Sequence, residues 1–176
     1  MTAELSFPVP TTEDRRWLNL QLGGGAVRDL GIYPMSLAYR LLGPPNGFEA
    51  SGTIAKTGVE TVATIESEHA GDSQAVMKCA FGGSLSNEAV VRGEEGSITL
   101  RAPFHHSPEI EVHRTGHEPM RINTSPRGHG FLAEVVEAER CVLEGEIESP
   151  QRSHAETVAV MEWIDAVLHR LGVSEV

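Results

Sequence analysis

Residues 23–43 read GGGAVRDLGIYPMSLAYRLLG and set the start of the first helix. Three glycines are followed by Asp29 and Tyr33, four residues apart, and Pro34 comes directly after the tyrosine. Proline disrupts a helix interior but suits its first position. We therefore predict a helix that begins at Pro34 and stops at Gly43, with Tyr33 projecting from the break before it. The apolar face of this helix would carry Met35, Ala38, Leu41 and Leu42.

The glycine run does not fit a dinucleotide-binding loop. That fingerprint needs a strand, then G-x-G-x-x-G at a helix start, then an acid about twenty residues later. Residues 22–31, LGGGAVRDLG, lack this spacing, and no hydrophobic strand directly precedes them. We expect no cofactor-binding residues here. The glycines at positions 23, 24, 25 and 31 are interpreted as backbone that permits close packing.

The middle of the chain, residues 47–123, alternates as strands do. The clearest runs are SQAVMKCAF, SLSNEAVVRG and GSITLR, separated by AGD at 70–72, GG at 82–83 and GEEG at 93–96. Weaker strands are expected at 48–56, 61–68, 109–114 and 119–123, and a short one in ELSFPVP near the N-terminus. Tight turns without crossover helices predict antiparallel neighbours.

Two helices are predicted after the strands. The segment 130–145 carries apolar residues at helical spacing and ends at Gly145. The segment 153–172 begins with the capping-box pair Ser153 and Glu156. The predicted apolar stripes are Phe131, Val135, Ala138 and Val142 in the first helix and Val160, Ile164, Val167 and Leu171 in the second.

This order of elements predicts one α+β domain over residues 1–176, with a largely antiparallel open sheet and helices packed on one face. The other face mixes Val76, Ala80 and Val90 with polar residues. Such a face is either solvated or meets a second copy of the chain. A homodimer through this face is therefore one prediction of the sequence.

Composition excludes several classes of protein. A formal net charge of −11 argues against a nucleic-acid partner, because phosphate neutralisation needs a basic patch. No apolar run reaches the length of a membrane span, and the N-terminus lacks the pattern of a signal peptide. Cys79 and Cys141 are far apart in the sequence, with no CxxC or metal-like spacing. We therefore expect two reduced thiols in a cytoplasmic protein. The histidines at 105, 106, 113 and 117 have no acid or cysteine at a ligand spacing, so no metal site is expected.

Three segments together resemble the C-terminal domain of the Gfo/Idh/MocA oxidoreductase family. The glycine run with D-x-G-x-Y at 29–33 is similar to the start of that domain, and the following proline resembles its glucose–fructose oxidoreductase and dihydrodiol dehydrogenase branch. VVRGEEGSITLRAPF resembles a strand–turn–strand segment of the family. GFLAEVVEAERCVLEGEIESP and ETVAVMEWIDAVLHRLG resemble its closing helices.

The resemblance implies an enzyme whose N-terminal Rossmann domain binds NAD or NADP and whose C-terminal domain shapes the substrate site and the dimer contact. Its substrates would be sugars, polyols or diols, changed by hydride transfer. The family's catalytic lysine, in a Glu-Lys-Pro motif, belongs to the Rossmann half, and neither Lys56 nor Lys78 precedes a proline here. We therefore expect the Rossmann domain to be absent from this chain, and the chain alone to bind no coenzyme and to be inactive. A fragment and a native short protein both remain open.

Asp29 and Tyr33 correspond to the family's substrate-side acid and tyrosine. A phenol can donate a proton to a developing alkoxide, and a carboxylate can orient a polyol. His129, in RGHGF, lies in a segment that lines the substrate cavity in the family. The predicted site is therefore Asp29 and Tyr33 in supporting catalytic and substrate-binding roles, with His129 binding substrate. Simple packing of this pair is the alternative reading, and a non-catalytic binding or assembly module is the alternative function.

Overall fold

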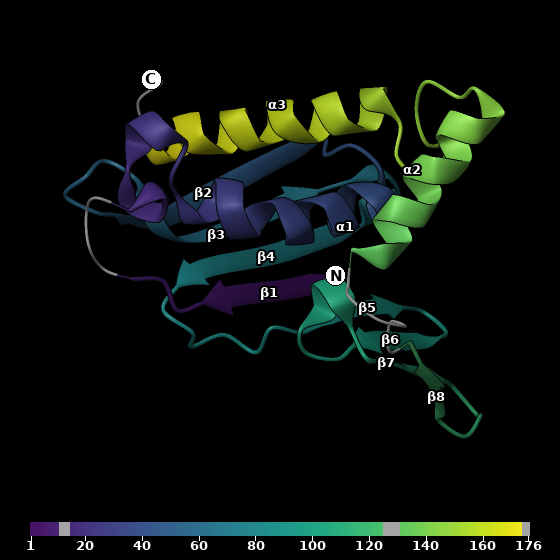
Figure 1. Ribbon diagram of the computed structural model, residues 1–176. Coiled ribbons are helices and arrows are strands. Elements are labelled where there is room, and N and C mark those ends of the chain that lie inside the picture. The colour runs from purple at the N-terminus through teal and green to yellow at the C-terminus, as the bar shows by residue number, and fades with distance from the viewer. Residues whose placement is uncertain (11–14, 125–130, 174–176) are drawn as a thin grey trace.

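A computed structural model describes residues 1–10, 15–124 and 131–173 of the chain (Figure 1). Eight strands form one open sheet in the order β2-β3-β4-β1-β5-β6-β7-β8. The strands are β1 (Thr2–Phe7), β2 (Gly47–Ile54), β3 (Glu60–Glu68), β4 (Gln74–Phe81), β5 (Ala89–Gly93), β6 (Gly96–Leu100), β7 (Glu109–Arg114) and β8 (Met120–Asn123). The four weaker strands predicted from the sequence are thus confirmed within two residues at each end.

One parallel strand pair joins the N-terminal strand, which lies outside the predicted antiparallel region, to the rest of the sheet. β1 runs parallel to β4, with Leu5 opposite Cys79, and every other pair in the sheet is antiparallel. A parallel pair needs a crossover connection, and here it contains the first helix and the β2–β3 hairpin. Within residues 47–123, the region for which antiparallel neighbours were predicted, every strand pair is antiparallel, so that prediction is confirmed. The helix that supplies the crossover lies before that region.

The first helix begins earlier than predicted. A π-helical turn, η3 (Val27–Gly31), continues directly into α1 (Ile32–Leu42), and Gly31 between them has helical dihedral angles of −64° and −26°. Pro34 is therefore the third residue of α1 but lies inside a continuous helical stretch, where its missing N–H removes one helical hydrogen bond. The π-helical turn directly before α1 is where the regular α-helical pattern is interrupted. Within α1, Met35 and Ala38 are buried as predicted.

The remainder of the predicted face of α1 is less buried. Leu42 is partly buried against the core, whereas Leu41 is exposed, contrary to the prediction. Gly43 ends the helix at a positive φ of 80°, as expected of a helix stop.

Helices α1 and α3 (His154–Leu171) cover one face of the sheet over β2, β3, β4 and β1 (Figure 1). The stripe predicted for α3 is confirmed, with Val160, Ile164 and Val167 fully buried. The Ser153 hydroxyl oxygen accepts a hydrogen bond from the Glu156 amide at 3.1 Å and so caps the helix. Helices on one face of a mainly antiparallel sheet confirm the predicted fold class.

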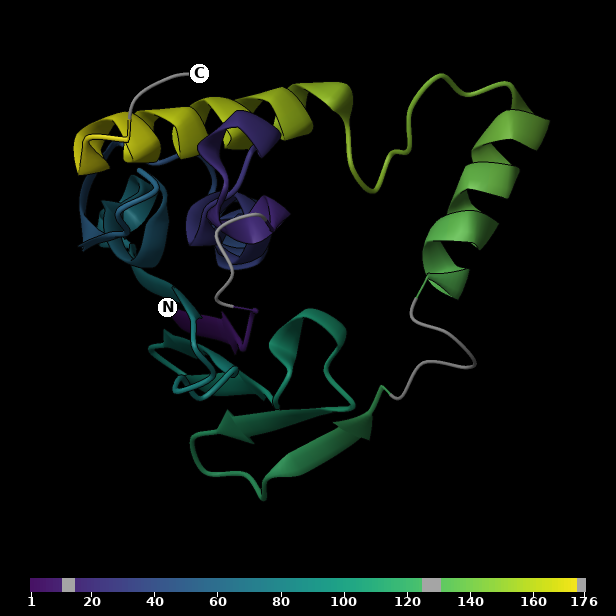
Figure 2. The ribbon, with the colours of Figure 1, turned by 60° about the vertical axis from the view of Figure 1, so that its left-hand side comes forward.

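The helix layer covers only half of that face. The side of the sheet that faces the helices remains apolar across β5 to β8. Ala89, Leu100, Ile110 and Ile122 lie opposite one another on this side of neighbouring strands. Figure 2 shows this half of the sheet with no α-helix over it in the described part of the chain. Ile98, Met120 and Ile122 are exposed as a result. We call this surface the uncovered apolar face, formed by Val91, Ile98, Leu100, Ile110, Val112, Met120 and Ile122.

Helix α2 (Leu132–Glu144) does not pack on the sheet as its stripe predicted. Figure 2 shows it standing away from the body, and Val142 is 77% exposed. Phe131, Val135 and Ala138 are also exposed, so the stripe contributes nothing to the core. The prediction failed because helical spacing shows that a helix is amphipathic without showing what covers its apolar side.

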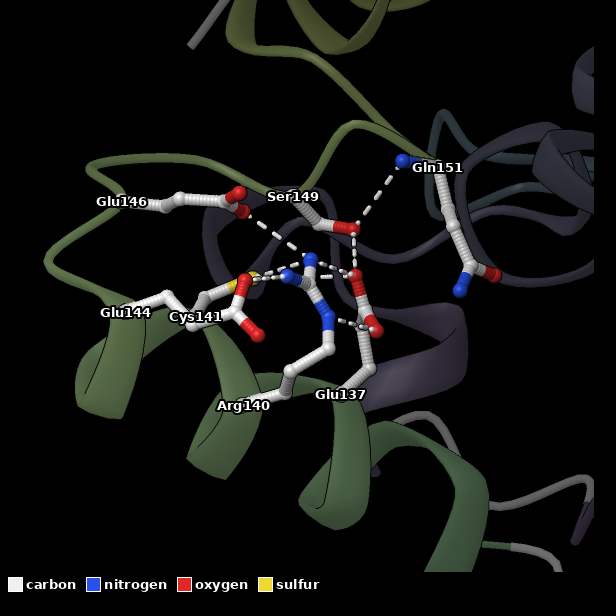
Figure 3. A network of polar contacts seen from close by, with 7 residues as sticks. All are labelled: Glu137, Arg140, Cys141, Glu144, Glu146, Ser149 and Gln151. Atoms are coloured by element: carbon white, nitrogen blue, oxygen red, sulfur yellow. Dashed lines mark hydrogen bonds and ion pairs between the residues drawn. The ribbon is translucent and has the colours of Figure 1, made fainter.

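The polar side of α2 is braced by the loop that follows it (Figure 3). Arg140 donates hydrogen bonds to Glu137 and to Glu146, both at 2.9 Å, and pairs with Glu144. Ser149 donates to Glu137 at 2.5 Å. Arg140 and Ser149 together lower the pKa of the Glu137 carboxyl to about 2. These contacts fasten the GEIES segment to α2, so the helix and its loop form a preformed unit.

Candidate functional site

Tyr33 lies at a cavity of about 610 Å³ between α1, the β6–β7 connection and the loop before α3. The connection contains a short helical turn, η5 (Phe104–His106). The lining residues are Ile32, Tyr33, Ser36, Leu37, Arg40, Leu100, Phe104, His105, Gln151, Arg152 and Glu156. The cavity therefore combines an apolar wall with a phenol, an imidazole and three charged side chains.

Tyr33 and His105 form the aromatic end of this cavity. Their ring centroids lie 4.8 Å apart with the ring planes tilted by 47°, and Tyr33 is 43% exposed. Burial, and to a smaller degree the neighbouring His106, lowers the pKa of His105. A neutral imidazole beside a phenol can accept or pass on a proton. The sequence analysis considered His105 only as a possible metal ligand, and only the fold brings it to Tyr33.

Asp29 lies outside this cavity in the described structure. Its carboxylate forms an ion pair with Arg16, and it is partly buried on η3. Residues four apart share a face in an α-helix, but Asp29 sits in a π-helical turn, whose hydrogen bonds span five residues. The two predicted residues are therefore close in sequence without both lining one cavity.

The glycine run is held by packing within the chain. The amides of Gly23, Gly24 and Gly25 all donate to backbone carbonyls of residues 17–20 at 2.9–3.0 Å, so they cannot also hold a pyrophosphate. A Cβ at Gly24 would lie 2.4 Å from the carbonyl oxygen of Arg16 and 2.7 Å from that of Trp17. The residues present thus do not fit a coenzyme-phosphate loop.

Beneath this run lies Glu60, a buried acid that the sequence analysis missed. Its carboxylate accepts a hydrogen bond from the Val27 amide at 2.8 Å, and a Cβ at Gly25 would lie 2.3 Å from the same oxygen. Burial raises the pKa of Glu60, and the hydrogen bond from Val27 opposes that rise. Glu60 fixes the start of η3, and η3 continues into the helix that carries Tyr33.

The opposite end of the cavity is basic. Glu156 lies between Arg40, at 3.1 Å, and Arg152, at 3.6 Å, and Arg152 also donates to the Ser36 hydroxyl at 3.3 Å. No motif in the sequence identified these residues, because they come from two helices and an intervening loop.

The remaining predicted features fall elsewhere. His129 lies outside the described residues. Among the residues that the structure describes, no group of three or more histidine, cysteine or acidic side chains is placed to hold a metal ion. No helix in the described ranges is long and apolar enough to cross a membrane.

A larger cavity, of about 880 Å³, lies between α3 and the ends of β2, β3 and β4. It is lined by neither Tyr33 nor Asp29, and most of its charged side chains are acidic. The smaller cavity contains the phenol, the imidazole and the two arginines, so we take it as the candidate site.

Comparison with known proteins agrees with this fold. The chain is 30% identical over 168 residues to the trans-1,2-dihydrobenzene-1,2-diol dehydrogenase of Danio rerio, covering 90% of this chain and 49% of that enzyme. It is 24% identical to the D-xylose 1-dehydrogenase (NADP(+)) of Hypocrea jecorina, covering 92% of this chain and 47% of that enzyme. The chain thus spans about half the length of these relatives.

Solved structures share the fold at lower identity. An aldose–aldose oxidoreductase from Caulobacter crescentus, complexed with glycerol, superposes with a TM-score of 0.81 at 20% identity over 96% of this chain and 52% of its own. A 3-ketoreductase from Actinomadura kijaniata, in complex with NADP and TDP-benzene, gives 0.73 at 21% identity over 97% of this chain and 53% of its own. The GFO/IDH/MocA C-terminal domain model matches residues 1–99, more than half of the chain. The chain therefore belongs to the GFO/IDH/MocA C-terminal domain family.

Proposed function

We propose that this chain is the substrate-binding and dimerisation domain of a cytoplasmic NAD(P)-dependent oxidoreductase that acts by hydride transfer on a sugar, polyol or diol. The observation that carries the proposal is the position of Tyr33. It lies at a cavity beside a histidine of lowered pKa, within a domain of a family whose relatives include diol and sugar dehydrogenases.

Tyr33 would exchange a proton with the reacting substrate oxygen, and His105 beside it would pass that proton on. An unperturbed phenol titrates near ~10, so proton exchange near neutral pH needs a cation close by. The catalytic lysine that the family carries in its Rossmann domain would supply this charge. Asp29, held by Arg16, takes a supporting role in placing the helix or the substrate, and His129 is proposed to contact substrate. The coenzyme, when bound by the Rossmann domain, supplies or accepts the hydride.

Two apolar surfaces that no described element of the chain covers support a Rossmann domain as the partner. The uncovered apolar face and the exposed stripe of α2 flank the open side of the molecule (Figure 2). Contiguous exposed apolar surface on a soluble domain marks a binding surface. The chain spans about half of its relatives, so a second domain of similar size would be available to cover these surfaces.

The opposite, polar face of the sheet is the proposed homodimer contact. Lys78 pairs with Glu4 at 3.3 Å, and Arg101 pairs with Glu88 at 3.1 Å and also with Glu111. Val76 and Val90 are only partly buried among these pairs. Light scattering of the chain would test this contact, and Val90→Arg should convert a dimer to a monomer.

The alternative function is a non-catalytic binding or assembly module. It is favoured by the amides of Gly23, Gly24 and Gly25, which all bond within the chain, so the glycine run does not serve as a phosphate-binding loop. Such a module would bind the sugar or polyol without changing it.

A chimera distinguishes the two functions. The chain would replace the C-terminal half of the Danio rerio dehydrogenase, and coenzyme reduction would be followed with diols and sugars as substrates. We expect activity that falls by about 10²-fold or more in Tyr33→Phe, the usual range for a lost acid–base group. The matched control is Tyr39→Phe, which alters the only other tyrosine of the chain, also on α1 but outside this cavity.

Calorimetry completes the test. The 176-residue chain alone should show no saturable binding of NADPH or NADH, whereas the chimera should bind one of them. A well-folded chimera that binds coenzyme and sugar but never turns over would favour the binding module. Tight coenzyme binding by the chain alone would overturn the domain assignment.

A further inference from the structure

The basic end of the Tyr33 cavity carries more positive than negative charge. Arg40, Arg152 and Glu156 are its ionised side chains, and the one carboxylate lies between the two guanidinium groups. The remaining titratable lining groups are Tyr33 and His105, and the pKa of His105 is lowered, which favours the neutral imidazole. The cavity therefore holds one uncompensated positive charge in a chain whose net charge is −11.

The Arg40 guanidinium keeps most of its donors available. Each nitrogen of the Arg152 guanidinium instead contacts Thr157, Ser36 or Glu156, so this group offers only the second N–H of its two terminal nitrogens. Arginine has five N–H donors in a planar fork that matches carboxylate and phosphate oxygens. Arg40 donates one hydrogen bond, to Glu156, and its side chain is 55% exposed. The Glu156 side chain is only 13% exposed, whereas those of Arg40 and Arg152 are 55% and 37% exposed, so the carboxylate is more deeply buried than the guanidinium groups with which it pairs.

The distance between the two ends suits a small ligand. Tyr33 and Arg40 are seven residues apart on α1, and a rise of 1.5 Å per residue separates them by about 10 Å along the helix. Leu37, Leu100 and Phe104 provide apolar surface in the same cavity. A ring with a hydroxyl or carbonyl at one end and an anionic group at the other would meet both ends.

We propose that Arg40 and Arg152 form a subsite for a carboxylate or phosphate group of the substrate, so that this domain takes sugar acids or sugar phosphates rather than neutral polyols. Glu156 acts as a positioning residue that aligns both guanidinium groups. That the ligand reacts at its hydroxyl or carbonyl end, beside Tyr33, rests on the proposed function. Binding of its anionic group by the two arginines does not.

The binding test uses the whole 176-residue chain and calorimetry at low ionic strength. The probes are glucose 6-phosphate, gluconate, inorganic phosphate and the neutral polyol glucitol. We expect glucose 6-phosphate or gluconate to bind at least tenfold more tightly than glucitol. The tighter of the two identifies the anionic group, and tighter binding than inorganic phosphate shows that the ring contributes.

Matched variants test the residues. Arg152→Gln and Arg40→Gln should each weaken binding of the preferred anion about tenfold or more, and Arg40→Lys should restore part of that loss. Arg114→Gln, at an exposed arginine of β7 that pairs with Glu95 in the β5–β6 turn, is the control and should change nothing. Thermal unfolding of each variant identifies any that is misfolded, and the Lys variant then carries the test. Equal binding of glucitol and the anions, or equal loss in the control, would overturn the proposal.

The two proposals fail separately. Anion binding that depends on Arg152 alongside an inactive chimera would contradict the proposed hydride transfer alone. An active chimera whose substrate affinity ignores both Arg40 and Arg152 would contradict the anion subsite alone. Tyr33→Phe should lower turnover of the chimera by a larger factor than it weakens anion binding.

Discussion

The ring of Tyr33 lies 4.8 Å from the ring of His105, which follows β6. The first belongs to the helix that crosses from β1 to β2, and the second belongs to the connection between β6 and β7. Their contact depends on the sheet order, which places β1 next to β5 and β6 next to β5. The candidate site is thus a product of strand pairing.

The Tyr33 ring helps to bury His105, so removing it should move the pKa of that histidine. We expect the imidazole to titrate below its ordinary value of 6.5 in the wild type, because burial disfavours the cation. Tyr33→Phe keeps the ring and should keep the lowered pKa, whereas Tyr33→Ala should return it toward 6.5. NMR titration of the His105 ring measures each value. A lowered pKa that survives in Tyr33→Ala would show that other groups bury the ring.

Glu60 should make the stability of the chain depend on pH. Its pKa in the folded state is raised above the ordinary 4.5 by burial, so the folded state holds the proton more tightly than the unfolded state. The free energy of unfolding should therefore fall as the pH rises from about 4.5 through the folded pKa. Glu60→Gln, which keeps the acceptor for Val27, should remove this fall.

Urea unfolding at a series of pH values checks the effect of Glu60. Glu66→Gln, at an exposed position on the same strand, is the control and should retain the wild-type dependence. Identical pH profiles for Glu60→Gln and the wild type would show that the carboxyl stays ionised in the fold.

Arg140 should account for the low pKa of Glu137. The hydrogen bonds from Arg140, followed by the one from Ser149, lower that pKa to about 2. A lowered pKa stabilises the fold above the ordinary value of 4.5, and this contribution is lost as the pH falls toward 2. Carboxyl NMR should find Glu137 near 2 in the wild type and closer to 4.5 in Arg140→Gln. Arg114→Gln again serves as the control, and a Glu137 pKa unchanged in Arg140→Gln would contradict the network.

Substitutions at two apolar positions, one in each predicted helix stripe, should change the free energy of unfolding by different amounts, because only one of the two side chains is buried. Ile164 is fully buried in α3, so Ile164→Ala should lower the free energy of unfolding by about 2–5 kcal/mol. Val142 in α2 is exposed, and Val142→Ala should cost less than about 0.5 kcal/mol. Urea unfolding measures both. A similar cost at the two positions would show that α2 packs on the body in solution.

The sequence alone determined the local structure and the family. Alternation located the strands, and Ser153 with Glu156 fixed the start of α3, because turns, caps and periodicity act through neighbouring residues. The D-x-G-x-Y stretch at 29–33, together with the two later segments, also resembles the family that the comparisons confirm.

The tertiary structure decided what local patterns cannot specify. Leu5 pairs in parallel with Cys79 across a long crossover, and the apolar stripes of α2 and α3 differ only in what lies opposite them. The site depends on the same long-range contacts, since Arg40 of α1 reaches Glu156 at the start of α3 and His105 reaches Tyr33 from a distant loop. The spacing of apolar residues shows which side of a helix or strand is apolar. Which element packs against that side is decided only when the whole sheet has formed.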